Sequence, residues 1–297
     1  MYLITGATGN IGSEVVRALR AADEPVAALV RGASARRPMF PHGVEIRHGD
    51  LTAPTGLRAV WDGIDAVFLL PGYDATPAIL RHAAAAGVTR VVLLSGVSAA
   101  SRDMTNAITA YMTRSEDAVR ESGLATTILR PAAFMSNALR WRDKLHDDAV
   151  VRLPFAGVRT ACIDPRDLAA VAATALRDPG YAGQVLLPTG PEALSPADQV
   201  EILGEVLGRP LTFAAQPDDE ARAEMLETTP APYVDAFFDF YVAGALDESQ
   251  VTTVVADVTG RAPSTFRGVG APPRGRVLRP GGNAVASMPL RDVDRSV

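Results

Sequence analysis

Short apolar runs recur along the first two thirds of the chain and alternate with longer segments in which apolar residues return every three or four positions. Continuous runs of this length are typical of strands that are buried on both faces, as in a parallel sheet. The alternation therefore predicts an α/β fold with a doubly wound parallel sheet. The predicted strands are Tyr2–Thr5, Pro25–Val30, Val44–Arg47, Ala66–Leu70, Arg90–Leu94, Ala125–Leu129 and Val185–Leu187.

The segments with helical spacing are predicted to cover this sheet, and after Pro131 they become more frequent than the strands. One of them has a serine before its first turn, a proline within that turn and a glycine at its end, which are typical helix boundaries. The predicted helices are Gly12–Ala22, Leu57–Trp61, Ile79–Ala86, Ala110–Ser122, Asp167–Leu176, Ser195–Gly208, Asp218–Thr228 and Tyr233–Thr259.

Composition excludes several classes of protein. The chain has 297 residues and a net charge of −5, which argues against a nucleic-acid partner. Its single cysteine, Cys162, allows no disulfide within the chain, and the four histidines lack metal-ligand spacing, so no metal is expected. No apolar run approaches the ~20 residues of a membrane span, and the first strand leaves no room for a signal peptide. We expect a cytoplasmic protein without a membrane partner.

Three glycines, Gly6, Gly9 and Gly12, stand between the first apolar run and the first helical segment. Glycines allow a sharp turn and let a ligand approach the backbone without meeting a Cβ. The start of the following helix offers unpaired N–H groups to a phosphate. With a strand before and a helix after, the pattern predicts a pyrophosphate site rather than a merely structural turn.

The motif TGATGNIG, with its G-x-x-G-x-x-G spacing, resembles the short-chain dehydrogenase/reductase superfamily on its extended and atypical branches. The segments LVRGAS, GDL, AAAAGVTRVVLLSGVSA, SGLATTILRPAAFMSN and VTGRAPSTF are similar to the NmrA-like group, and the likeness covers about residues 1–266. That resemblance implies a Rossmann-type fold and an NAD(P) cofactor. The loop residues expected to contact it are Gly6, Thr8, Gly9, Asn10, Ile11 and Gly12.

The same resemblance suggests how the chain is divided. Residues 1–155 are expected to form the NAD(P)-binding domain, with residues 160–190 returning to it, and 191–266 a smaller, mainly helical lobe on the substrate side. Residues 267–297 carry six arginines and two aspartates with little apolar periodicity. We expect a disordered tail there; the alternative is a basic arm that binds a partner.

The end of the second strand predicts which nucleotide is bound, because an acidic residue there would repel a 2′-phosphate. The chain instead has Arg31, followed by Arg36 and Arg37, and no acidic residue lies between positions 26 and 43. A guanidinium can pair with phosphate, so NADP(H) is favoured over NAD(H). The remaining expected cofactor contacts follow later strands and are Asp50, Leu51, Leu70, Pro71, Gly72 and Ser95; for Asp50 a turn or helix-cap role is the alternative.

The proton donor of most carbonyl reductases in this superfamily is a Tyr-x-x-x-Lys pair, and this chain has none. The candidate tyrosine, Tyr111, is followed four positions later by Ser115, and the only lysine is Lys144. Some NmrA-like quinone reductases carry His or Lys and Glu on this helix. Here Glu116 resembles that glutamate, but Met112 stands where the histidine would be. Tyr111 therefore has either a catalytic role or a packing role.

An acceptor site is expected around LRPAAFMSN, which follows the sixth strand. By resemblance this loop lies under the nicotinamide and presents Phe134, Met135 and Asn137 to a substrate; packing between the lobes is the alternative. The aromatic stretch YVDAFFDFY could form the opposite wall, although its helical spacing favours core packing.

Two functions agree with these observations. The favoured one is an NADPH-dependent oxidoreductase that passes hydride to a small-molecule quinone or similar conjugated acceptor, because a quinone needs little help from a protein acid. The alternative is a non-catalytic NADP(H)-binding redox sensor of the NmrA type with a protein partner. A homo-oligomer is possible in both cases.

Overall fold

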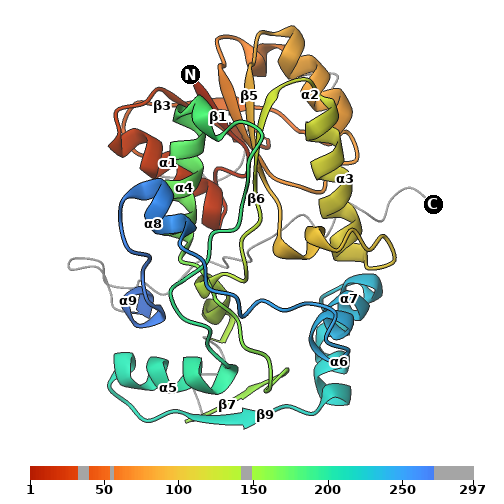
Figure 1. The fold of residues 1–297 in the computed structure, drawn as a ribbon, viewed down its shortest axis with the longest axis vertical. Helices are drawn as coiled ribbons and strands as arrows, with labels where there is room; N and C mark the ends of the chain where they lie inside the picture. The colour runs from red at the N-terminus through yellow and green to blue at the C-terminus, as the bar shows by residue number, and fades with distance from the viewer. Residues whose placement is uncertain (33–39, 54–56, 142–148, 271–297) are drawn as a thin grey trace.

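The computed structural model describes residues 1–32, 40–53, 57–141 and 149–270. Its central element is a seven-stranded sheet in which every neighbouring pair is parallel, in the order β3-β2-β1-β4-β5-β6-β8 (Figure 1). The predicted α/β class and parallel sheet are therefore confirmed. The strands are β1 (Tyr2–Ile4), β2 (Val26–Val30), β3 (Val44–His48), β4 (Ala66–Leu69), β5 (Arg90–Leu94), β6 (Ala125–Leu129) and β8 (Val185–Leu186).

The strand order reverses between β1 and β4. From β1 the chain moves outward through β2 to β3, and it then returns to β4 on the other side of β1. At such a switch point the loops after the two neighbouring strands diverge and leave a crevice at the carboxyl edge of the sheet. The glycine motif follows β1 and Leu70–Pro71–Gly72 follows β4, so both border this crevice.

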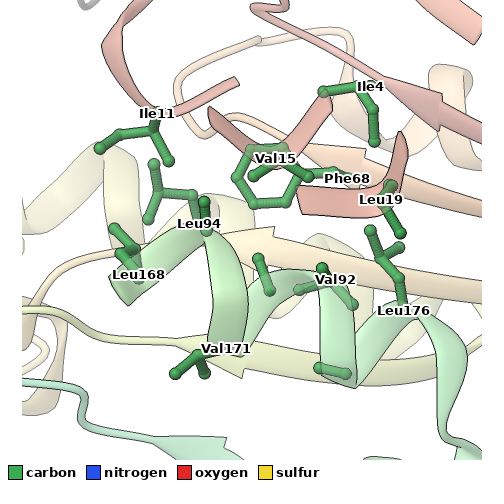
Figure 2. Packing of buried hydrophobic residues seen from close by; sticks show 14 of the residues in the cluster. Ile4, Ile11, Val15, Leu19, Phe68, Val92, Leu94, Leu168, Val171 and Leu176 are labelled. Carbon is green, nitrogen blue, oxygen red and sulfur yellow. The ribbon is translucent and has the colours of Figure 1, made fainter. Parts of the chain in front are cut away.

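Helices cover both faces of the sheet. On one face, α1 (Asn10–Ala21) packs beside α4 (Pro165–Arg177), and α8 (Val254–Thr259) packs on α4. Figure 2 shows the core between α1, α4 and the sheet, where Val15 and Leu19 approach Phe68 and Leu168 approaches Leu94. On the other face, α2 (Thr76–Ala85) and α3 (Ala107–Glu121) pack against the second buried cluster.

A smaller lobe lies beyond the carboxyl edge of the sheet (Figure 1). It contains a second, two-stranded parallel sheet of β7 (Val150–Leu153) and β9 (Thr212–Ala215), which the sequence analysis did not predict. Its helices are α5 (Pro196–Leu207), α6 (Asp218–Leu226) and α7 (Ala231–Tyr241).

The single helical stretch expected at Tyr233–Thr259 is wrong. The helix α7 ends at Tyr241, and Gly244 then adopts a positive φ of 75°. The N–H groups of Ala243 and Ala245 bond back to the carbonyls of Phe238 and Asp239, which ends the helix. The chain next runs without regular structure under the sheet and reaches α8, which returns to the sheet domain.

Two smaller expectations also change. The segment expected as a helix at Leu57–Trp61 is a 3-10 turn at Arg58–Trp61. The segment expected to be disordered from Arg267 onward begins inside a short helix, α9 (Phe266–Gly270), where Arg267 pairs with Glu205 of α5. Residues 271–297 lie outside the described residues, as do Arg36, Arg37 and Lys144.

Candidate active site at the carboxyl edge of the sheet

The glycine loop after β1 is too tight for side chains. Gly6 has a φ of +59°, and its carbonyl accepts a hydrogen bond from the Gly9 N–H at 2.9 Å. A Cβ at Gly12 would lie 2.6 Å from the carbonyl carbon of Gly6, well inside van der Waals contact. Gly12 is therefore required so that the first turn of α1 can pack directly against the loop.

The start of α1 fits a pyrophosphate. Its N-cap residue, Gly9, has no side chain to bond the first N–H groups, so these remain for a phosphate. Thr8 and Gly9 are exposed, and Asn10 is half-buried. Ile11 is buried in the core beside α4, so its contribution is to fix the helix rather than to offer its side chain to a ligand.

The ends of β2 and β3 bring Arg31 and Asp50 close together. Burial opposes ionisation of Asp50, but hydrogen bonds from the backbone N–H and hydroxyl of Thr52, at 2.9 and 2.8 Å, and the charge of Arg31 lower its pKa below the usual value. Asp50 therefore holds the turn, and its expected contact with the cofactor stays a prediction. Arg31 is exposed at the strand end, whereas Leu51 is buried.

The loop after β4 closes the other side of the crevice. The Leu70 N–H donates to the hydroxyl of Thr5 at 2.9 Å, and the Leu70 side chain lies directly over Gly6. Pro71 is buried. Gly72 has a φ of +87°, and its N–H donates to Ser115 Oγ at 3.0 Å. The glycine loop and this loop are thus joined at the switch point, as expected for the cofactor's path.

Tyr111 lies over the Gly72 end of this loop. A Cβ at Gly72 would be 3.5 Å from the Tyr111 ring, and the ring centroid of Tyr233 lies 6.3 Å away. Burial raises the pKa of the Tyr111 phenol far above its usual value. The structure thus places Tyr111 beside the crevice in a packed aromatic pair, and its catalytic role stays a prediction.

Ser95, at the end of β5, points into the protein. Its hydroxyl donates to Glu116 Oε1 at 2.7 Å and lies 3.8 Å from Met112 Sδ. Glu116 is 1% exposed, and its carboxylate also accepts from Arg130 and Arg120. Burial opposes its ionisation, but these hydrogen bonds and charges lower its pKa below the usual value. Glu116 is therefore a fixed anion rather than a proton donor.

The loop after β6 joins the two parts of the molecule. Phe134 pairs with Ile163 in a single β-bridge, and the Met135 N–H donates to the Ile163 carbonyl at 2.9 Å. The Met135 side chain is buried with Cys162 and Phe266, which agrees with its packing alternative. Phe134 and Asn137 are half-buried and remain candidates for the acceptor wall.

The sequence analysis missed a polar pair beneath this loop. Tyr241, at the end of α7, donates its phenol hydrogen bond to Glu248 Oε2 at 2.7 Å. Glu248 is 8% exposed and lies in the irregular segment between α7 and α8. No sequence signal could have found the pair, because that segment was expected to continue the helix.

Comparison with known families decides the identity of the glycine-loop site. Residues 6–179 match the NAD(P)H-binding family. The chain belongs to this family. Its likeness to the NmrA-like group of atypical short-chain dehydrogenases/reductases is confirmed, and the Rossmann-type fold with it.

Two relatives of this NAD(P)H-binding chain match over nearly their whole length. The (4-alkanoyl-5-oxo-2,5-dihydrofuran-3-yl)methyl phosphate reductase of Streptomyces griseus is 37% identical over 273 residues. The NAD(P)H azoreductase of Xenophilus azovorans is 36% identical over 273 residues. Each match covers 90% of this chain and 95% of the relative. The predicted class, an NAD(P)H-dependent oxidoreductase, is confirmed.

A solved structure shares the fold of this family member. The NADPH-dependent quinone oxidoreductase of Escherichia coli, in complex with NADPH, has a TM-score of 0.76 at 20% identity and covers 91% of this chain and 98% of its own. At that identity the likeness establishes the fold alone.

The described residues were also compared with two other kinds of feature, a metal site and a membrane-spanning helix. They contain no group of three or more His, Cys, Asp or Glu side chains that could hold a metal ion. Among the same residues, every helix is too short or too polar to cross a membrane. Cys162 is a buried free thiol, and burial raises its pKa to about 11.

Proposed function

We propose that the protein is an NADPH-dependent oxidoreductase that reduces a quinone or another planar, conjugated acceptor. The observation that carries the proposal is the arrangement at the switch point, where an uncapped helix start and two glycine-bearing loops meet. Both close relatives are named as reductases, and one of them acts on azo compounds by its name.

The preference for NADP(H) over NAD(H) is part of this proposal. The family binds NAD(P)H, and Arg31 stands at the end of β2 where a 2′-phosphate would be read. An exposed guanidinium at this place favours a phosphate through a charge-assisted hydrogen bond. When bound, the cofactor supplies the hydride.

The kind of acceptor follows from what the chain lacks. A ketone needs a strong proton donor during hydride transfer, and this sequence has no Tyr-x-x-x-Lys pair. A conjugated acceptor spreads the incoming charge over its ring system, so holding donor and acceptor in contact supplies much of the rate. Phe134 and Asn137 after β6, and the aromatic residues of α7, are the surfaces that would hold it.

The test is the oxidation of NADPH, followed by absorbance, with a panel of quinones and azo dyes and with NADH in parallel. Turnover that is faster with NADPH supports the whole proposal. Turnover that is equal with both cofactors supports the reaction and contradicts the Arg31 interpretation. Tight NADPH binding without turnover on any acceptor would favour the alternative, a redox sensor whose partner is another protein.

A further inference from the structure

Tyr241 and Glu248 form a polar pair beneath the loop after β6, and the steps described above do not use it. The phenol donates to Glu248 Oε2 at 2.7 Å, and the backbone of Ala133 also hydrogen-bonds the Glu248 carboxyl group. Burying a carboxyl group this deeply lowers the stability of the fold unless the group is neutral or all of its oxygens are hydrogen-bonded. Its described partners are the Tyr241 hydroxyl and the Ala133 backbone, which are both neutral, and the nearby acid Asp247.

The position of the pair is the second observation. Tyr241 packs against the apolar cluster that contains Met112 and Tyr111, and Met112 lies against Ser95 and Gly96 at the end of β5. Through Glu248 and Ala133 the same pair contacts the loop after β6. Tyr241 therefore packs on the cluster that borders the end of β5, while its partner Glu248 contacts the loop after β6, where the acceptor is proposed to bind.

The third observation is a strained aromatic residue beside the phenol. Phe155 is half-buried and has a φ of +57°, a left-handed conformation that is rare for a bulky side chain. Its ring centroid lies 5.1 Å from that of Tyr241 and 5.4 Å from that of Phe238. The Phe155 ring meets Phe238 edge to face, at 74°, and is tilted by 51° from Tyr241. Strain of this kind is held where the surrounding structure needs the side chain in one place, and here it fixes an apolar ring beside the phenol.

From these observations we propose that Tyr241 is the proton donor to the acceptor, that Glu248 is the positioning residue that resupplies its proton, and that the Phe155 ring is the apolar wall on which a planar acceptor stacks. The inference deepens the proposed function and rests on it. It assigns to Tyr241 of the smaller lobe the proton donation that a Tyr-x-x-x-Lys pair would otherwise perform.

The reaction balances with the components already named. The acceptor gains a hydride from NADPH and one proton, and NADP⁺ leaves. The Tyr241 O–H, which points to Glu248 Oε2 in the structure, turns to the bound acceptor, and the O–H of protonated Glu248 then donates to the phenol oxygen instead. The Tyr241 O–H bond breaks as its proton goes to the acceptor oxygen or nitrogen that carries the developing negative charge. Protonated Glu248 then gives its proton to the Tyr241 oxygen across the 2.7 Å hydrogen bond, and water reprotonates Glu248.

The groups around the pair favour its protonated form. Burial raises the pKa of Glu248, the hydrogen bond from Tyr241 opposes this, and Asp247 adds to the rise. Burial also raises the pKa of Tyr241, and Glu248 and Cys162 add to that rise whenever they are ionised. On α7, Asp239 is bonded to Asn106, and Arg222 of α6 lies over Phe238 at 5.2 Å.

The test compares Tyr241→Phe and Glu248→Gln with the wild type and with a matched control, Tyr181→Phe, whose ring packs against the core on the far side of α4. NADPH oxidation by 1,4-naphthoquinone is followed from pH 5.5 to 9, in H₂O and in D₂O. We expect Tyr241→Phe to lower kcat about 10²-fold, to raise KM by no more than the about 2- to 10-fold that one lost hydrogen bond is worth, and to abolish the solvent isotope effect. Glu248→Gln should flatten the pH profile, and Tyr181→Phe should behave as wild type.

A second readout needs no turnover. Quenching of protein fluorescence by 1,4-naphthoquinone, without NADPH, reports acceptor binding. Loss of one hydrogen bond in Tyr241→Phe should weaken binding about 2- to 10-fold. If both variants keep the wild-type kcat, pH profile, isotope effect and quinone affinity, the proton-donor proposal is wrong while the proposed function stands. If the wild type oxidises no NADPH with any acceptor, the proposed function is wrong, and the donor role that rests on it is wrong as well.

Discussion

Glu116 of α3 and Arg130, which follows β6, form a bidentate ion pair at the carboxyl edge of the sheet. Arg130 Nε lies 2.8 Å from Oε1 and Nη2 lies 2.7 Å from Oε2 of the carboxylate. Ser95 at the end of β5 and Arg120 on α3 complete the shell around the anion. One buried carboxylate thus fixes the ends of β5 and β6 to the helix that carries Tyr111.

Replacing Glu116 with glutamine should destabilise the fold strongly. The variant leaves Arg130 with a half-buried, uncompensated charge, and breaking a buried pair in this way costs about 3–5 kcal/mol. Arg130 is partly exposed, so we expect the lower end, about 3 kcal/mol, in urea unfolding. Glu121→Gln, at the exposed end of the same helix, is the control and should stay within about 0.5 kcal/mol of wild type.

The Glu116 carboxylate makes the free energy of unfolding depend on pH, and the direction of its pKa shift sets the direction of that dependence. Its pKa is lower in the folded protein than in the unfolded chain, because its hydrogen bonds and ion pairs outweigh the effect of burial. Its stabilisation is therefore present above the unfolded pKa, about 4.3, and is lost as the pH falls towards the folded pKa. The stability difference between wild type and Glu116→Gln should shrink on acidification below about pH 4; a difference that grows there would contradict this assignment.

Gly12→Ala should abolish cofactor binding. The new methyl group would collide with the backbone of Gly6, which cannot move without opening the phosphate loop. The expected result is a loss of NADPH affinity of at least about 10²-fold, since a rigid loop places every phosphate contact. Gly157→Ala is the matched control, because nothing lies within 4 Å of its added Cβ. Fluorescence titration with NADPH distinguishes the two, and equal affinities would show that the loop tolerates side chains.

The features that the sequence predicted are the local ones. The glycine loop is a strand, a turn and a helix within about twenty residues, so each of its parts carries its own signal. The strands β2, β4 and β5 were visible because each is buried on both faces and lacks alternating polar residues. Where a helix joins two of the strands, as α2 joins β4 to β5 and α3 joins β5 to β6, the parallel arrangement follows from that connection.

The features that the sequence could not predict depend on distant partners. The strands β7 and β9 are four residues each, and they pair across about sixty intervening positions, so neither has a strong pattern alone. The carboxylates Glu116 and Glu248 look alike in the sequence. Their opposite pKa shifts arise because Arg130 and Arg120 surround one of them, whereas Tyr241 and the Ala133 backbone face the other.

Arg31→Ala should change the choice of cofactor. If Arg31 contacts the 2′-phosphate, its removal costs a charge-assisted hydrogen bond of about 1.5 kcal/mol at an exposed site, or about 10-fold in NADPH affinity. The affinity for NADH should change little. Arg58→Ala, an exposed arginine in the 3-10 turn before β4, is the control and should change neither. Equal weakening of both cofactors would mean that Arg31 supports the loop rather than reading the phosphate.

Substitutions at Phe155 can separate backbone strain from function. Phe155→Gly and Phe155→Ala both remove the ring, but only glycine adopts the backbone conformation of this position without strain. Glycine adopts a φ of +57° without cost, whereas alanine costs about 1 kcal/mol there. We therefore expect Phe155→Gly to be more stable than Phe155→Ala by about 1 kcal/mol in urea unfolding. Both variants lose the contacts with Tyr241 and Phe238, so both should bind 1,4-naphthoquinone more weakly than wild type to a similar degree. If Phe155→Ala is at least as stable as Phe155→Gly, the backbone at this position is not strained. If quinone affinity instead follows stability, the ring acts by holding the lobe together and not as the wall on which the acceptor stacks.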